Sequence, residues 1–199
     1  MISHSSEAFG LADELVDMAD NASLSVGTLR AAILGPWVAA SQLLSQQVSD
    51  PTKPYGRHVL VDGAHLEVML ATWTRGIFCA PHDHGGSQGV VRVLQGRALH
   101  RIYRVESGQL QMVREERAQA GELLTCGRDL VHSMGDDGGE LPLVTLHMYT
   151  DPVPHMVVYD EAANRTLKVD GRSGAWVPAS DSEHLLGHRE GMIAPHEMR

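Results

Sequence analysis

The first quarter of the chain repeats apolar residues at the spacing of a helix. The clearest members of this pattern are Phe9, Ala12, Val16 and Ala19. Acidic residues such as Asp13 and Asp17 lie between them, as on an amphipathic helix. The pattern predicts a helical segment over residues 1–50, with later helices at 28–34 and 37–47, and the prolines that follow stop helix continuation.

From residue 55 onward the pattern changes to short strands separated by turns. Pairs such as Gln95-Gly96 and Ser107-Gly108 have the composition of tight turns. The predicted strands cover residues 59–61, 66–73, 89–94, 98–105, 109–114, 123–124, 143–149, 156–159 and 166–169. Many short strands predict a mainly β barrel or sandwich over residues 55–170, followed by a poorly patterned tail over residues 171–199.

Composition narrows the class of protein. With 199 residues and 43% hydrophobic content, the chain suits a single globular domain. No apolar run has the length of a membrane span, and we expect no signal peptide. The formal charge of −9 argues against nucleic acid or a membrane surface as partner. Cys79 and Cys126 do not make a disulfide scaffold, so we expect buried thiols in a cytoplasmic protein.

A histidine pair gives the first chemical signal. If His82 and His84 lie on a strand, their imidazoles point the same way and can bind one metal ion together. A common metal motif has an acid four or five residues further on, where this chain has Gln88 and Gly89. The alternative is a pair of ordinary core or surface histidines.

His132 is the candidate third ligand, because a later strand of a barrel can fold back beside an earlier one. Three neutral histidines leave a divalent ion with its full charge and with open positions. In such a site Zn(II) activates water, whereas Fe(II) can bind a substrate and O₂ together. The missing acid favours a substrate that arrives as an anion, such as a thiolate.

A second candidate site lies on an alternating segment, Thr145-Leu146-His147-Met148-Tyr149. On a strand, Thr145, His147 and Tyr149 share one face. If that face is buried, the hydroxyl, imidazole and phenol must hydrogen-bond to each other or to a ligand, and they would make a proton relay. The alternative is the solvent-facing side of an edge strand. Arg57 suits a carboxylate ligand, although a lone arginine is more often a surface residue.

Taken together, these segments resemble the thiol dioxygenases of the cysteine dioxygenase family, which are cupins. The matching pieces are Tyr55-Gly56-Arg57, Trp73, Pro81-His82-Asp83-His84, Val91-Arg92-Val93-Leu94-Gln95-Gly96, His132 and Thr145-Leu146-His147-Met148-Tyr149. The resemblance implies a mainly β, jelly-roll cupin with N-terminal helices. It also implies one Fe(II) held by His82, His84 and His132, and oxidation of L-cysteine by O₂ to cysteine sulfinic acid.

The same resemblance implies a Ser-His-Tyr triad, which falls on Thr145, His147 and Tyr149, with threonine keeping the hydroxyl. It implies an arginine that pairs with the substrate carboxylate and a nearby tyrosine, which fall on Arg57 and Tyr55. Relatives that prefer 3-mercaptopropionate carry glutamine at this arginine position. The arginine therefore favours cysteine.

One position departs from the animal members of the family, in which a cysteine crosslinks to the triad tyrosine. That position is Gly89 here, as in many bacterial members. We therefore expect Tyr149 to remain an unmodified phenol.

Other functions stay open at this point. The thiol could be another mercapto acid, such as 3-mercaptopropionate or mercaptosuccinate. A zinc or manganese cupin of another reaction class and a non-catalytic ligand-binding or sensor cupin are further alternatives. The sequence does not indicate an oligomeric state.

Overall fold

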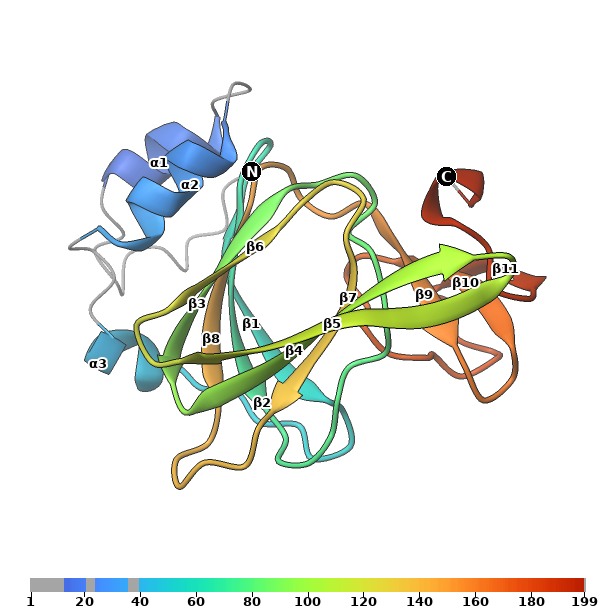
Figure 1. Cartoon of the computed structure of the whole chain (residues 1–199). Helices are drawn as coiled ribbons and strands as arrows, with labels where there is room; N and C mark the ends of the chain where they lie inside the picture. The colour runs from blue at the N-terminus through green and yellow to red at the C-terminus, as the bar shows by residue number, and fades with distance from the viewer. Residues whose placement is uncertain (1–12, 21–23, 36–39, 199) are drawn as a thin grey trace.

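A computed structural model of the chain describes all residues except 1–12, 21–23, 36–39 and 199 (Figure 1). Three short helices come first: α1 (Asp13–Ala19), α2 (Val26–Ile33) and α3 (Ala40–Leu44). The strands follow: β1 (Tyr55–Asp62), β2 (Glu67–Trp73), β3 (Gly89–Gln95), β4 (Arg97–Glu106), β5 (Gln109–Gln119), β6 (Leu123–Cys126), β7 (Val131–Asp136), β8 (Val144–Tyr149), β9 (His155–Asp160), β10 (Arg165–Asp170) and β11 (Leu185–Glu190). A 3₁₀ turn, η2 (Pro195–Glu197), lies near the C-terminus.

The strands form two facing walls. One wall is a five-stranded sheet in the order β1-β2-β8-β3-β6. The other contains two three-stranded sheets, β5-β4-β7 and β11-β10-β9. Residues 78–83 join these two sheets, because Phe78 pairs with Gly135 of β7 and His82 bridges both β7 and β9. The predicted mainly β fold with N-terminal helices is confirmed.

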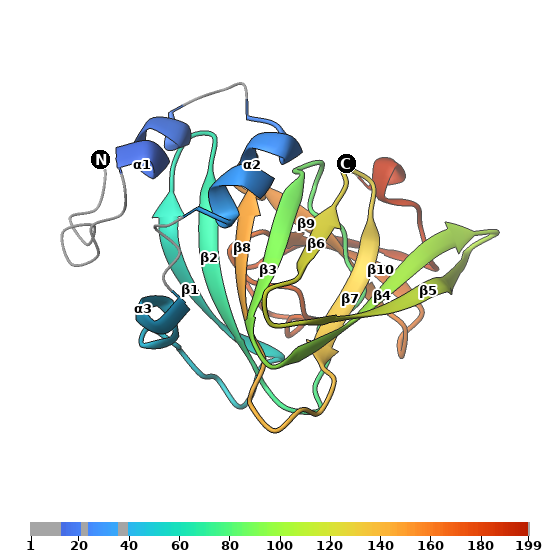
Figure 2. The same ribbon diagram turned by 60° about the vertical axis from the view of Figure 1, so that its left-hand side comes forward.

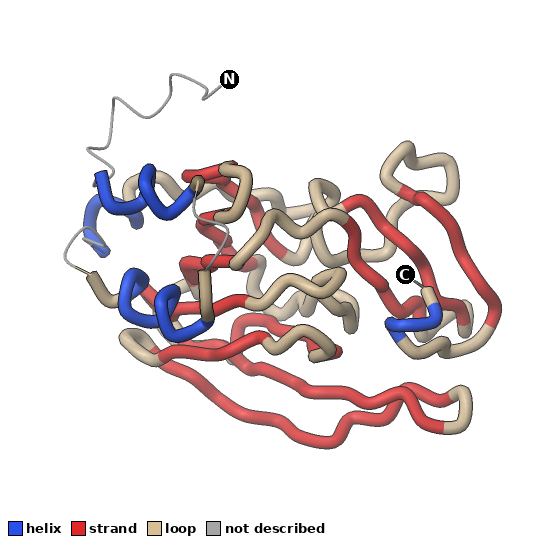
Figure 3. Tube along the Cα trace, turned by 90° about the horizontal axis from the view of Figure 1, so that it is seen from above, coloured by secondary structure: helices blue, strands red, loops and turns tan. Residues whose placement is uncertain are grey.

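The helices cover the outer face of the five-stranded sheet, as Figures 2 and 3 show. Strands β2 and β8 are consequently buried along their whole length on both faces. Apolar residues of their outer faces, such as Leu70 and Leu146, pack with Leu29 and Ile33 of α2. The inner faces of β2 and β8 line the space between the two walls. The polar side chains of β8, Thr145, His147 and Tyr149, lie on this inner face.

The bounds of the helices differ from those that the sequence predicted. In α1 the buried side chains are Leu15 and Met18, whereas Phe9 and Ala12 of the predicted pattern lie outside the described residues. Helix α2 begins after Ser25, whose Oγ accepts a hydrogen bond of 3.1 Å from the Thr28 backbone N–H. This cap fixes the start of α2 two residues before the predicted one.

Two strands were not predicted. Strand β7 has the sequence VHSMGD, which lacks a clear alternation, yet all six residues are buried between neighbouring segments. Strand β11 lies in the predicted tail and pairs with β10. The predicted single domain, with a helical segment over residues 1–50, a barrel over 55–170 and a tail over 171–199, stays a prediction. Among the described residues no helix is long and apolar enough to span a membrane.

Candidate metal centre and substrate pocket

The histidine pair lies in the irregular connection between β2 and β3, outside the regular strands. His82 is held by reciprocal backbone hydrogen bonds of 2.9 Å with His132. The side chain of the intervening Asp83 accepts a hydrogen bond of 2.7 Å from the Val157 backbone N–H of β9. The connection thus serves as an extra strand between β7 and β9. This strand-like pairing meets the condition under which the sequence allowed both imidazoles to bind one metal ion.

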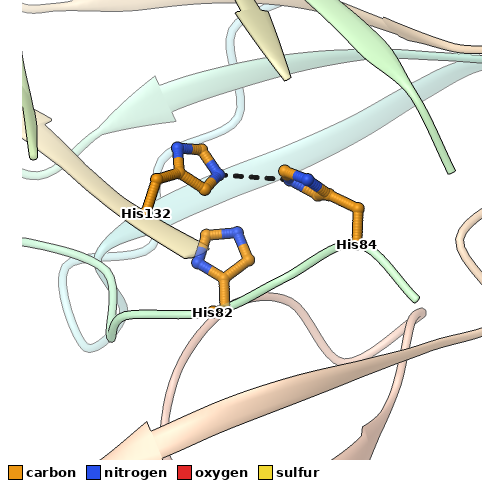
Figure 4. A group of neighbouring side chains, drawn as sticks. All are labelled: His82, His84 and His132. Atoms are coloured by element: carbon orange, nitrogen blue, oxygen red, sulfur yellow. Dashed lines mark hydrogen bonds between the residues drawn. The ribbon is translucent and has the colours of Figure 1, made fainter. Parts of the chain in front are cut away.

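His82, His84 and His132 come together, and all three side chains are buried (Figure 4). One nitrogen from each ring lies within 4.8 Å of the others. The Nε2 atoms of His84 and His132 are 3.2 Å apart. Nitrogen ligands at about 2.1 Å from a metal ion have this kind of separation, so the cluster fits one divalent ion.

Nδ1 of His82 and of His132 has a hydrogen-bond partner, which leaves Nε2 of each ring as the metal-binding nitrogen, whereas Nδ1 of His84 has no partner among the described residues. Nδ1–H of His82 donates to the Ala80 carbonyl oxygen at 2.9 Å. Nδ1 of His132 lies 2.7 Å from Nε2 of His100. Burial lowers the pKa of His82 to about 4, and it lowers the pKa values of His84 and His132 well below their ordinary value. The rings are therefore neutral at neutral pH, which is the form that binds metal.

The three-histidine cluster includes no carboxylate or thiolate. A set of three neutral nitrogen donors suits a first-row divalent ion such as Fe(II) or Zn(II), and it leaves coordination positions for ligands from outside the protein. The residues present thus fit the metal that the resemblance implied, and the donor set alone does not choose between these ions.

The alternating segment of β8 forms a buried hydrogen-bonded chain. Thr145 Oγ1 lies 2.8 Å from His147 Nε2, and His147 Nδ1 lies 3.2 Å from the Tyr149 hydroxyl. Trp73 Nε1–H donates to Thr145 Oγ1 at 2.8 Å. Because β8 lies between β2 and β3, the alternative of a solvent-facing edge strand is wrong.

This chain has a direction, because an indole can only donate. With Trp73 donating to it, the Thr145 hydroxyl can donate to Nε2 of His147. The His147 proton then resides on Nδ1 and is donated to the Tyr149 oxygen. Burial lowers the pKa of His147 to about 3 and raises that of Tyr149 well above its ordinary value. The Tyr149 O–H is left free to donate toward the histidine cluster, where its oxygen lies 3.5 Å from His84 Nε2.

Gly89 makes room for the tyrosine ring. A Cβ atom at this position would lie 2.5 Å from Cδ1 of Tyr149. The ring therefore occupies the space of the missing side chain. Cys126, opposite Gly89 on β6, and Cys79 are both free and buried as predicted, and burial raises the pKa of each thiol to about 12.

Arg57 and Tyr55 line a small cavity of about 30 Å³ together with His82, His84 and Tyr149. Arg57 Nη2 forms an ion pair of 2.6 Å with Glu67, and its Nε donates to the Met69 sulfur at 3.2 Å. The Tyr55 hydroxyl accepts a hydrogen bond of 3.0 Å from the Ala175 backbone N–H. The cavity is of the size of a few water molecules.

The sequence did not point to Glu67, His100 or Glu116 as residues near the site. Trp73 was among the matching pieces of the family resemblance, but it had no predicted role. His100 and Glu116 lie behind His132, Glu67 pairs with Arg57, and Trp73 supports the β8 chain. The signal for Glu67 was a charged residue at the start of a mainly apolar strand, since burying a charge requires a partner.

Comparison with known proteins agrees with the geometry of the site. Residues 45–162, more than half of the chain, match the family model described as Cysteine dioxygenase type I.

Two similar solved structures have low sequence identity to this chain. An oxalate oxidase has a TM-score of 0.48 and 18% identity, covering 61% of this chain and 63% of that one. An uncharacterized conserved protein with a double-stranded β-helix domain from Klebsiella pneumoniae has a TM-score of 0.46 and 16% identity, covering 60% of this chain and 95% of that one. The chain thus spans less than two thirds of the oxalate oxidase. With its cupin jelly roll and the family match, the chain belongs to the cysteine dioxygenase type I family.

Proposed function

We propose that the protein is a thiol dioxygenase that converts L-cysteine to cysteine sulfinic acid at one Fe(II) held by His82, His84 and His132. The observation that carries this proposal is the convergence of three buried, neutral histidines without an acidic ligand. This arrangement supports a metal centre that accepts an anionic thiolate from solution. Membership in the cysteine dioxygenase type I family supports the reaction class.

The proposed reaction is R–SH + O₂ → R–SO₂H. Both oxygen atoms are transferred to sulfur, which loses four electrons, and O₂ gains the same four. Bound Fe(II) would supply the redox chemistry that allows O₂ to react with a thiolate. The side chains of the pocket bind and orient the substrate and hold its proton donors in place.

Arg57 is the proposed partner of the substrate carboxylate. Its guanidinium has five N–H donors, and its contacts to Glu67 and Met69 use the Nη2 and Nε groups. The Nη1 group remains a candidate for the carboxylate. Tyr55 and Tyr149 flank this cavity and offer hydroxyl groups.

Glu67 supports an amino-acid substrate over a simple mercapto acid. It is buried, and it is the acidic residue among those that line the cavity. With Arg57 it presents a positive and a negative charge side by side, which match the carboxylate and the amino group of cysteine. A mercapto acid without an amino group would leave Glu67 beside a second carboxylate, where like charges repel.

Tyr149 is the proposed hydrogen-bond donor to the reacting group. The chain from Trp73 through Thr145 and His147 leaves its O–H unused by the other members. Its high pKa keeps the phenol protonated at neutral pH. A fixed donor beside the metal centre stabilises developing negative charge at little cost in reorganisation.

A thiol panel tests the proposal. Protein loaded anaerobically with Fe(II) is mixed with L-cysteine, 3-mercaptopropionate or mercaptosuccinate, and O₂ uptake is followed while products are identified by mass spectrometry. We expect the highest kcat/KM for L-cysteine, one O₂ consumed per thiol, and both atoms of ¹⁸O₂ in the sulfinate. Zn(II)-loaded protein is the control and should consume no O₂.

The outcomes separate the competing functions. A higher kcat/KM for 3-mercaptopropionate or mercaptosuccinate would refute L-cysteine as the preferred substrate. The proposed reaction, thiol dioxygenation, would still hold. Absence of O₂ uptake with all three thiols, in protein that contains stoichiometric iron, would refute thiol dioxygenation. Such a result would leave a metal cupin of another class.

A further inference from the structure

A row of polar side chains crosses the three-stranded sheet β5-β4-β7 behind the candidate metal centre. Glu116 of β5, His100 of β4 and His132 of β7 lie on adjacent strands. Glu116 Oε1 is 2.9 Å from His100 Nδ1, and His100 Nε2 is 2.7 Å from His132 Nδ1. The row runs from the surface of the sheet to a metal ligand without a gap.

The protons of this row can be placed by elimination. His132 binds a metal through Nε2, so its proton must reside on Nδ1. That N–H needs an acceptor, and the acceptor is Nε2 of His100. The His100 proton then resides on Nδ1 and is donated to the Glu116 carboxylate. Every donor and acceptor of the row is used once, and each bond fixes the orientation of the next ring.

We propose that His100 and Glu116 are positioning residues that fix the tautomer and orientation of His132 for metal binding. A ligand histidine commonly donates its second N–H to a carboxylate, and such partners raise the basicity of the ligand. Here a second histidine is inserted between the ligand and the carboxylate. The negative charge of Glu116 strengthens the His100 hydrogen bond, which in turn polarises the His132 ring toward the metal.

The two ends of the row lie in different environments. The His100 side chain is only 2% exposed, whereas that of Glu116 is 29% exposed and is also bonded by Arg114. Glu116 lines an open groove of about 700 Å³ whose other lining residues come mainly from β5, β6 and α2. Partial burial raises the pKa of Glu116, but hydrogen bonds from His100 and Arg114 outweigh it and lower the pKa below its ordinary value. The partly exposed Glu116 carboxylate is thus connected to the buried ligand His132 through the hydrogen bonds of His100.

Glu115 offers a matched control. It is the next residue on β5 and is bonded to Arg101 and Arg117, but it takes no part in the row. Glu115→Gln removes the same charge from the same strand as Glu116→Gln. Comparison of the two variants separates the effect of the row from the effect of surface charge.

The test measures metal binding and does not require turnover. Metal-free wild type, Glu116→Gln, His100→Phe and Glu115→Gln are titrated anaerobically with Co(II), and Kd and the visible absorption spectrum are recorded. We expect Kd to rise about 10- to 100-fold for His100→Phe and about 10-fold for Glu116→Gln, with a shifted spectrum in both. Glu115→Gln should match the wild type in both measurements.

Wild-type affinity and an unchanged spectrum in folded Glu116→Gln would overturn the inference. This variant keeps the test decisive if His100→Phe fails to fold, because Glu116 is partly exposed. The inference rests on the metal site of the proposed function but not on its substrate. If the wild type itself bound no Co(II), both the proposed metal site and the positioning role of His100 and Glu116 would be refuted. If the wild type bound Co(II) and all variants matched it, only the positioning role would fail.

Discussion

Glu67 and Arg57 place opposite charges on the wall of the cavity, 2.6 Å apart. If Glu67 meets the amino group of cysteine, Glu67→Gln will lower kcat/KM for L-cysteine and spare 3-mercaptopropionate, which has no amino group. A hydrogen bond to a charged group contributes roughly 1.5–3 kcal/mol, so the ratio of the two kcat/KM values should shift roughly 10- to 100-fold toward 3-mercaptopropionate. Steady-state O₂ uptake with both thiols measures this ratio.

A surface pair is the control for this substitution. Glu106 pairs with Arg104 at 3.0 Å, and both side chains are more than half exposed. Glu106→Gln should leave the substrate ratio unchanged. An unchanged ratio in Glu67→Gln as well would show that Glu67 does not face the amino group.

Tyr149 is the last member of the β8 chain, and its hydroxyl is 3.5 Å from His84 Nε2. Tyr149→Phe removes the proposed donor but no metal ligand. We expect kcat to fall about 100-fold while iron content remains that of the wild type. Parallel measurement of turnover and metal stoichiometry checks this expectation. A variant that loses iron in proportion to its activity would assign Tyr149 a role in the metal site instead.

At the scale of elements, β3 and β8 must lie close enough for the Tyr149 ring to cover Gly89. Gly89→Ala would place a Cβ atom 2.5 Å from the ring and 3.0 Å from the Met148 carbonyl oxygen. Overpacking of this kind costs about 1–3 kcal/mol of the free energy of unfolding. We expect a lower Tm and a loss of activity greater than the loss of folded protein, because the ring shifts away from His147.

Gly127 provides the comparison for this prediction. A Cβ atom at Gly127 would meet no atom within 4 Å, and its backbone is not left-handed. Gly127→Ala should therefore keep the wild-type Tm and activity. Tm is measured by thermal unfolding and activity by O₂ uptake. If Gly89→Ala and Gly127→Ala have the same Tm and the same activity, the close contact between Gly89 and the Tyr149 ring does not contribute to stability or activity.

The elements also explain which local predictions succeeded. On β8 the apolar residues Leu146 and Met148 pack beneath the helices, while the polar residues between them face the site. Such a strict alternation is visible in a sequence because the side-chain period of a strand is two. On β7 both faces are buried against other segments, so His132, Ser133 and Met134 are buried alike and no alternation marks the strand.

At the scale of the whole molecule, the metal ligands come from segments that meet only in the folded protein. His82 and His84 lie between β2 and β3, and His132 lies on β7. A metal ion that binds this arrangement stabilises the fold, by about 2.7 kcal/mol when its free concentration is 100 times Kd. For a chain of this size, that corresponds to a rise in Tm of about 5–10 °C.

Chelation therefore should lower Tm, and added Fe(II) under anaerobic conditions should restore it. Differential scanning calorimetry of loaded and chelated protein measures the shift. His132→Ala is the control, and its Tm should respond to the metal little or not at all. A response equal to that of the wild type would remove His132 from the ligand set.

The sequence alone determined the fold class, the three histidines and the polar face of β8. The polar face of β8 follows from local periodicity, whereas the cupin class and the three histidines as one ligand set rest on the resemblance to the cysteine dioxygenase family. Only the tertiary structure decided that Glu67 neutralises Arg57 and that His100 and Glu116 support His132. These contacts depend on which residues face each other across neighbouring strands. That register is set by the packing of the whole molecule, so no local pattern records it.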